Sequence, residues 1–221
     1  MHASQLVVVG SGLLALAVSV ILWPVVGYAI TLAHEGGHAL AASMMGGTVD
    51  YLNMDRGRGG ETKASGLGPV GGFLMGIAGY TGPSGFGVGG ALLLAHDQVR
   101  LVLWLSVLFL LAALFASGTY VARFTVVVVG ALAVLLIRKG SAGQQVFFTY
   151  TWIWFLLLGG FGHVLVLQRI RAEGDPGSDA LLLRRMTFLP ASLFSGFFWL
   201  VSVCALLFGG AVLLRLYHAG P

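Results

Sequence analysis

The chain has 221 residues, of which 57% are hydrophobic and only 9% are charged, and its mean hydropathy is +0.93. Soluble globular domains carry about 25% charged residues, so this composition excludes an ordinary soluble domain and predicts an integral membrane protein. The net charge of +4 is spread without a long basic run, and nothing indicates a nucleic-acid partner. Cys204 is the only cysteine, which excludes an intramolecular disulfide and a cysteine-rich metal site.

Seven apolar stretches are candidates for membrane-spanning helices, which need about 20 mostly apolar residues. They cover residues 6–23, 24–45, 69–95, 99–117, 121–137, 146–167 and 190–214. We therefore expect an all-α polytopic membrane protein with six or seven transmembrane helices. The polar connections between the stretches are too short for a further globular domain, so residues 1–221 are expected to form a single domain in the membrane.

The second stretch carries the pattern His-Glu-x-x-His at His34, Glu35 and His38. Residues four apart lie on one face of a helix, one turn apart, so the two imidazoles can share a metal ion. In this pattern the histidines bind zinc and the glutamate takes a proton from a water molecule. The chain contains few His and Glu residues, so roughly 0.002 matches are expected by chance. Ionisable groups inside a span are costly and usually functional, and the pattern therefore predicts a metal site.

Residues 46–66 follow the motif and are the most polar part of the first half of the chain. A β-branched and aromatic stretch, a glycine-rich turn and a second extended piece predict a short β-hairpin-like insertion after the motif helix. A flexible polar loop is the alternative.

The third stretch has glycines at helical spacing and a Gly-Pro pair in its middle. Gly68, Gly72 and Gly76 predict close contact with another helix. Gly82-Pro83 is expected to bend or interrupt the helix. Irregular backbone at that depth is tolerated only beside protein or a wet cavity, so we expect this point to lie against the metal site.

His163 and the pair Ser178-Asp179 are the polar residues of the second half of the chain that bear on the metal site. His163 lies near the end of the stretch 146–167, where its depth matches that of His38 if the helix is tilted; it would bind the metal or simply bond to a neighbour's carbonyl. Ser178 or Asp179 would cap the N-terminus of a helix that follows them. No aspartate lies in the middle of an expected span.

The basic residues are distributed unequally between the two faces of the membrane. If the spans alternate in direction, the loops 46–68, 118–120 and 168–189 share a face with the N-terminus. That face receives Arg56, Arg58, Lys63, Arg123, Arg169, Arg171, Arg184 and Arg185, against Arg100, Arg138, Lys139 and Arg215 on the other. The positive-inside bias places the first face in the cytoplasm, and His38 would lie roughly 10 Å below it. We expect the site to open toward the cytoplasm.

Taken together, these segments resemble the site-2 protease family of intramembrane zinc metalloproteases, in particular its small bacterial single-domain relatives. The matching pieces are residues 34–40 in a span, the hairpin-like segment, residues 79–84, and residues 177–180 ahead of Thr187 and Pro190. The resemblance implies one metalloprotease-like domain over residues 1–221 and a location in the bacterial cell membrane.

The resemblance also implies a ligand set. His34 and His38 would bind Zn²⁺, Glu35 would be the general base, and an aspartate on a later helix would be the third ligand, with water in the fourth position. The family's usual Leu-Asp-Gly motif is absent here. Asp179 is assigned instead, because it opens a helix on the expected site face and resembles the small relatives. A helix cap at Asp179 and a ligand at His163 remain the alternatives.

The leading functional hypothesis is a membrane-embedded zinc endopeptidase that hydrolyses a membrane protein or peptide substrate in or near the lipid bilayer. One alternative is a proteolytically inactive family member that serves as a membrane binding or scaffold protein. Another is a transporter that uses His34 and Glu35 as a proton or metal path. The chain has no internal repeat and no paired broken segments, which argues against the transporter.

Overall fold

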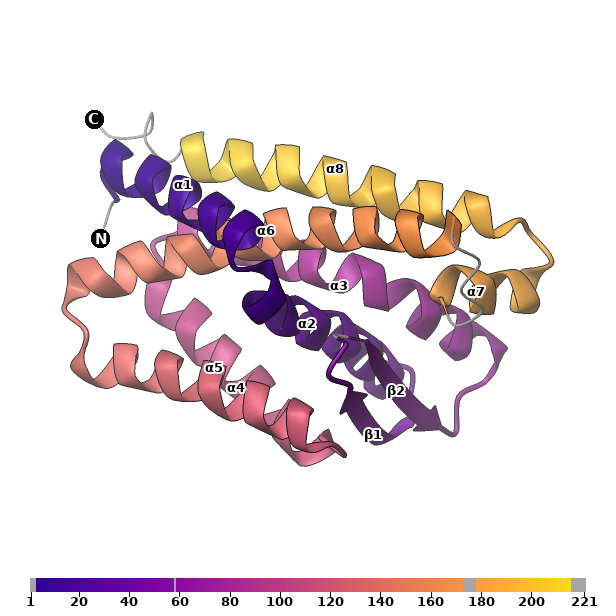
Figure 1. Ribbon diagram of the computed structural model, residues 1–221. Coiled ribbons are helices and arrows are strands. Elements are labelled where there is room, and N and C mark those ends of the chain that lie inside the picture. The colour runs from indigo at the N-terminus through magenta and orange to yellow at the C-terminus, as the bar shows by residue number, and fades with distance from the viewer. Residues whose placement is uncertain (1–2, 58, 173–177, 216–221) are drawn as a thin grey trace.

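A computed structural model describes residues 3–57, 59–172 and 178–215 (Figure 1). The described residues are mostly helical, with one small two-stranded sheet. The apolar stretches and the hairpin-like segment of the sequence predict this combination. In chain order the elements are α1 (Gln5–Ile21), α2 (Trp23–Met44), β1 (Thr48–Met54), β2 (Gly60–Ser65), α3 (Pro69–Ala95), α4 (Val99–Ala116), α5 (Tyr120–Lys139), α6 (Ala142–Ala172), α7 (Asp179–Thr187) and α8 (Ala191–Arg215).

The chain bends sharply between α1 and α2. Pro24 lies in the first turn of α2, where its missing amide hydrogen costs nothing, but it cannot continue α1. The two helix axes differ by 105°, so the first two expected spans form a bent pair.

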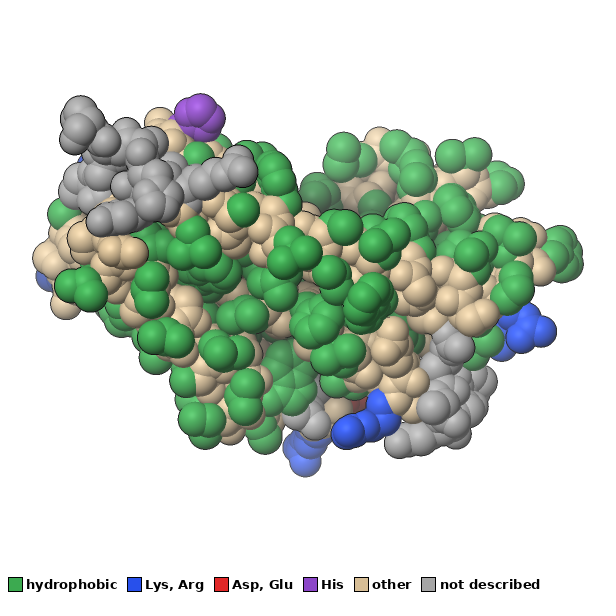
Figure 2. All heavy atoms as spheres, turned by 90° about the horizontal axis from the view of Figure 1, so that it is seen from above, with side chains coloured by type: hydrophobic (Ala, Val, Ile, Leu, Met, Phe, Trp, Pro, Cys, Tyr) green, Lys and Arg blue, Asp and Glu red, His purple; other side chains and the backbone are tan. Residues whose placement is uncertain are grey.

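The expected count of six or seven spans is not confirmed. By length and composition, α4, α5, α6 and α8 are the candidate membrane spans among the described residues, with a fifth if the bent pair is counted as one span. The many glycines of α3 and the ionisable motif in α2 lower the hydropathy of these two helices. Hydrophobic side chains nevertheless cover most of the face shown in Figure 2, and Lys and Arg appear toward its rim, as expected for a protein surrounded by lipid.

Helices α3, α6 and α8 run side by side, and α2 crosses α3 with the most extensive contact between any two helices (Figure 1). The main core joins α1, α2, α3, α4, α6 and α8 through buried residues such as Ile30, Ala91, Ile153 and Leu213. Helices α4 and α5 pack chiefly against each other. The motif helix is therefore held at the centre of the bundle.

The crossing of α2 and α3 depends on glycine. A Cβ added to Gly82 would lie 3.1 Å from the Cα of Gly37, and one added to Gly37 would overlap the carbonyl oxygen of Ala78. The expected position of Gly82-Pro83 beside the motif helix is thus confirmed. Helix α3 is not interrupted there, however, because it continues through Pro83 to Ala95.

Two further glycines of α3 contact α7. Added Cβ atoms at Gly72 and Gly76 would meet Met186 and Leu183, respectively. Leu183 is fully buried in a cluster that α7 shares with α3, α6 and α8. This contact fixes the short helix that begins at Asp179.

The hairpin expected after the motif is present. Strands β1 and β2 are antiparallel, with Thr48 opposite Ser65 and Met54 opposite Gly60. The outer edge of β1 is bonded to the α4–α5 turn, where the amide of Gly118 donates to the carbonyl of Leu52 at 2.9 Å. The opposite edge, that of β2, pairs with no other strand in the described part of the chain.

We predict that Gly37→Ala lowers the free energy of unfolding by about 1–3 kcal/mol, because the added methyl group must displace the backbone of α3. The matched control is Gly85→Ala in α3, where an added Cβ meets nothing within 4 Å. Thermal unfolding in detergent compares the two variants with the wild type. Equal midpoints for all three proteins would show that the glycine contact between α2 and α3 is not needed.

Candidate metal centre

Helix α2 places His34 and His38 on one face, as the four-residue spacing predicts. Both side chains are buried, each residue being 6% exposed, and their Nε2 atoms lie 3.2 Å apart. The Nδ1 atom of His38 lies 2.7 Å from the carbonyl oxygen of Met75. A carbonyl can only accept, so Nδ1 carries the hydrogen and donates it. In the neutral imidazole this leaves the lone pair of Nε2 free to bind a metal ion.

Helix α7 brings Asp179 to the two histidines. Its Oδ2 atom lies 3.2 Å from Nε2 of His34 and 3.2 Å from Nε2 of His38. Asp179 is the first residue of α7, and Ser178 occupies the N-cap position without a capping hydrogen bond from its side chain. The carboxylate of Asp179 therefore faces α2, in the place where a third ligand is needed.

The three donor atoms form a triangle whose sides are all 3.2 Å. Tetrahedral zinc with ligands at about 2.0–2.1 Å requires separations of roughly 3.3–3.4 Å between ligand atoms. Oδ2 of Asp179 is buried and has no hydrogen-bond partner among the described residues. The triangle thus fits one face of a tetrahedral site, and the group His34, His38 and Asp179 could bind a metal ion.

The charge state of the Asp179 carboxyl group suits a metal ligand. Burial raises the pKa of this carboxyl, but the neighbouring His38 and His34 lower it, and the net pKa lies well below its usual range. The carboxylate is therefore ionised near neutral pH, which is the form that binds a cation.

Glu35 lies beside the triangle without being part of it. Its side chain is buried, with the residue 3% exposed, and Oε1 is 3.9 Å from Nε2 of His34. Strand β2 covers the carboxylate: Oγ1 of Thr62 donates to Oε2 at 2.8 Å, and an added Cβ at Gly60 would overlap the carboxylate. The sequence motif did not reveal these two hairpin contacts, because they depend on the register of β2 against α2.

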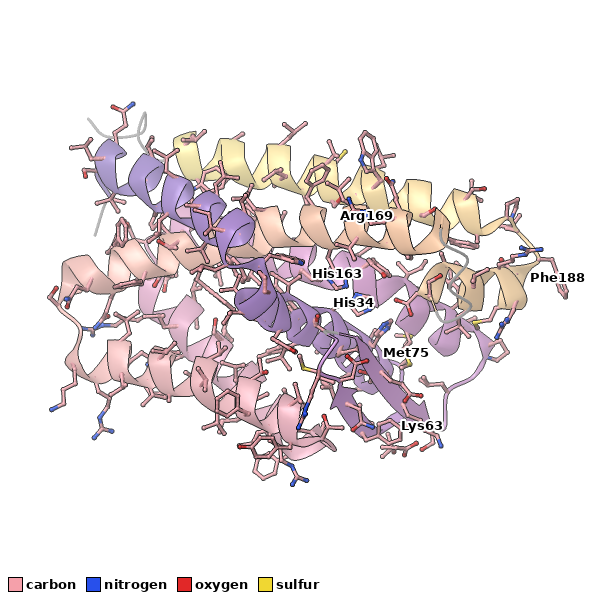
Figure 3. The ribbon with its side chains drawn as sticks, viewed as in Figure 1. His34, Lys63, Met75, His163, Arg169 and Phe188 are labelled. Carbon is pink, nitrogen blue, oxygen red and sulfur yellow. The ribbon has the colours of Figure 1, made fainter. Side chains whose placement is uncertain are left out.

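His163 lies next to the triangle and outside it. Its ring centroid is 5.0 Å from that of His34 and 5.3 Å from that of Tyr80, which in turn packs edge-on against His34 at 4.5 Å (Figure 3). Among the described residues, the group able to hold a metal consists of His34, His38 and Asp179. The structure therefore places His163 as an aromatic neighbour of a donor residue.

A cavity of about 970 Å³ contains these groups. The motif residues and Asp179 line one part of it, and residues of the hairpin line another, including Gly60 and Thr62. Arg169 of α6 and Arg185 of α7 also reach the cavity. The buried donors are thus accessible from a space large enough for a peptide segment.

Comparison with known proteins identifies the family. The family model described as Peptidase M50B-like matches residues 7–209, which is most of the chain and includes all the residues of the metal centre. Neither the curated proteins nor the solved structures gave a match. The apolar helices and the family together make this an integral membrane protein of a metallopeptidase family. The chain belongs to the Peptidase M50B-like family, and its domain is a site-2 protease domain.

Proposed function

We propose that the protein is an intramembrane zinc endopeptidase that hydrolyses peptide bonds of membrane-embedded proteins or peptides. The observation that carries this proposal is the triangle formed by His34, His38 and Asp179, with the carboxylate of Glu35 beside it in the same cavity. Two imidazoles and one carboxylate, with a fourth position left for water, are the ligand set of many zinc peptidases. Zinc bound there would lower the pKa of a water molecule and polarise the scissile carbonyl.

Glu35 would act as the general base. Its carboxylate takes a proton from the attacking water and returns it to the leaving amine. The carboxylate is suited to this role because Oε1 faces the donor triangle while Oε2 is held by Thr62. The bond from His38 to the carbonyl of Met75 keeps one imidazole in the orientation that the metal needs.

The shape of the cavity favours an extended substrate. One turn of a helix about 10 Å wide fills roughly 400 Å³, so the cavity of about 970 Å³ holds only a short part of a membrane-spanning helix. Residues of β2 line the same cavity, and the edge of β2 that pairs with no other strand in the described part of the chain could bind the substrate by strand addition. Unwinding would also expose the peptide group, which helical hydrogen bonds otherwise shield.

We further propose that the site opens toward the cytoplasm of a bacterial cell. The hairpin and α7 border the cavity, and both carry basic residues, including Lys63 and Arg185. The positive-inside bias places such segments in the cytoplasm.

Removal of the base should abolish turnover while leaving the metal in place. Glu35→Gln keeps the shape of the side chain but cannot take a proton, and we expect kcat to fall by roughly 10²–10⁴-fold. The probe is a synthetic peptide with one apolar span interrupted by Gly-Pro, carrying a fluorophore and a quencher, in detergent micelles with the purified protein. Asp50→Asn, which changes an exposed carboxylate on β1, is the control and should match the wild type. Unchanged turnover in Glu35→Gln, or none in the wild type, would contradict the proposed function.

The metal content tests the ligand set separately. We expect about one zinc ion per wild-type chain, and at least a 10-fold weaker affinity in Asp179→Ala, because that variant lacks one corner of the triangle. His163→Phe keeps a ring beside His34 and should bind zinc like the wild type. Elemental analysis after dialysis against increasing concentrations of a chelator gives the zinc content and the relative zinc affinity of each variant. Zinc loss in His163→Phe but not in Asp179→Ala would reverse the assignment, and a metal-free wild type would favour a scaffold.

A further inference from the structure

Thr62 makes a hydrogen bond that the metallopeptidase motif does not require. Its Oγ1 lies 2.8 Å from Oε2 of Glu35 and 3.0 Å from the carbonyl oxygen of the same residue. A hydroxyl group has one hydrogen to donate, and an ionised carboxylate accepts a shorter and stronger bond than a carbonyl. The hydroxyl therefore serves chiefly the carboxylate of Glu35.

The two oxygens of this carboxylate have different surroundings. Oε2 accepts from Thr62, whereas Oε1 lies 3.9 Å from Nε2 of His34, on the side of the donor triangle. Rotation of the carboxylate plane away from this orientation would break the bond to Thr62. Thr62 thus fixes the orientation of the carboxylate, with one oxygen directed toward the metal centre.

Gly60, two residues earlier on β2, restricts the conformation of the Glu35 side chain from another direction. A Cβ at this position would overlap Oε1 of Glu35 and lie 2.6 Å from its Cδ and Cγ atoms, so the backbone of β2 packs directly on the carboxylate. A glycine leaves room for the carboxylate and still covers it. The rotamer of Glu35 is therefore constrained both by a hydrogen bond and by contact with the backbone.

We propose that Thr62 is a positioning residue that holds Oε2 of Glu35 so that Oε1 is presented to the attacking water. The inference rests on the proposed function, in which Glu35 is the general base. A base that is misplaced by about 1 Å can lose roughly 10²-fold in rate. Because Thr62 belongs to a strand that lines the cavity, the element proposed to bind an extended substrate would also set the position of the base.

The test compares Thr62→Val, which removes the hydroxyl from a side chain of the same shape, with Thr62→Ser, which keeps it. We expect kcat for the fluorogenic peptide to fall by roughly 10–100-fold in Thr62→Val, with KM and zinc content unchanged. Thr62→Ser keeps the hydroxyl and should therefore retain most of the wild-type kcat. Thr48→Val is the matched control, because it makes the same change at an exposed position of β1 and should retain the wild-type kcat.

Wild-type kcat in Thr62→Val would overturn the inference, and so would an equal loss in Thr62→Ser and Thr62→Val. A change confined to KM, or a loss of zinc together with activity, would show that Thr62 serves substrate binding or folding instead. Glu35→Gln is measured in parallel to separate the two proposals. If Glu35→Gln is inactive and Thr62→Val is not, only the positioning role fails; if Glu35→Gln is active, the proposed function fails with it.

Discussion

The structure depends on one constraint: the ionisable groups of the motif are almost entirely buried in an apolar bundle, where little of their surface can meet water. His34, Glu35 and His38 are each at most 6% exposed. A buried polar group without a partner is costly, so other elements must supply partners. Helix α3 supplies the carbonyl of Met75, strand β2 supplies the hydroxyl of Thr62, and α7 supplies the carboxylate of Asp179. These three elements therefore converge on α2, and their convergence defines the site.

Close packing makes this convergence geometrically possible. Gly37 and Gly82 let the backbones of α2 and α3 touch, and an added Cβ at Gly79 would overlap the imidazole of His38. Gly76 receives Leu183 and so fixes α7. In a membrane, where apolar side chains gain little by leaving lipid, such contacts are a main source of helix association. Several of the glycines that lower the hydropathy of α3 thus help to assemble the metal centre.

The sequence allowed the local features to be predicted and left the tertiary ones open. The spacing of His34 and His38 follows from helical periodicity, and the hairpin follows from its strand and turn residues. Asp179 lies far from the motif in sequence, and it was suggested by the resemblance to a family and by its place at the start of a helix on the expected site face, since periodicity cannot show where α7 packs. The count of six or seven spans is not confirmed, because α1 and α2 form a pair bent by 105° and because the glycines of α3 lower its hydropathy. The role of Thr62 depends on the register between β2 and α2, and no local pattern encodes it.

The most direct test of the account is a structure of the zinc-loaded protein, with the metal located by its anomalous scattering. We predict zinc within about 2.0–2.2 Å of Nε2 of His34, Nε2 of His38 and a carboxylate oxygen of Asp179, with one further position open to solvent. Zinc bound through His163 in place of Asp179, or bound away from the triangle, would contradict the account.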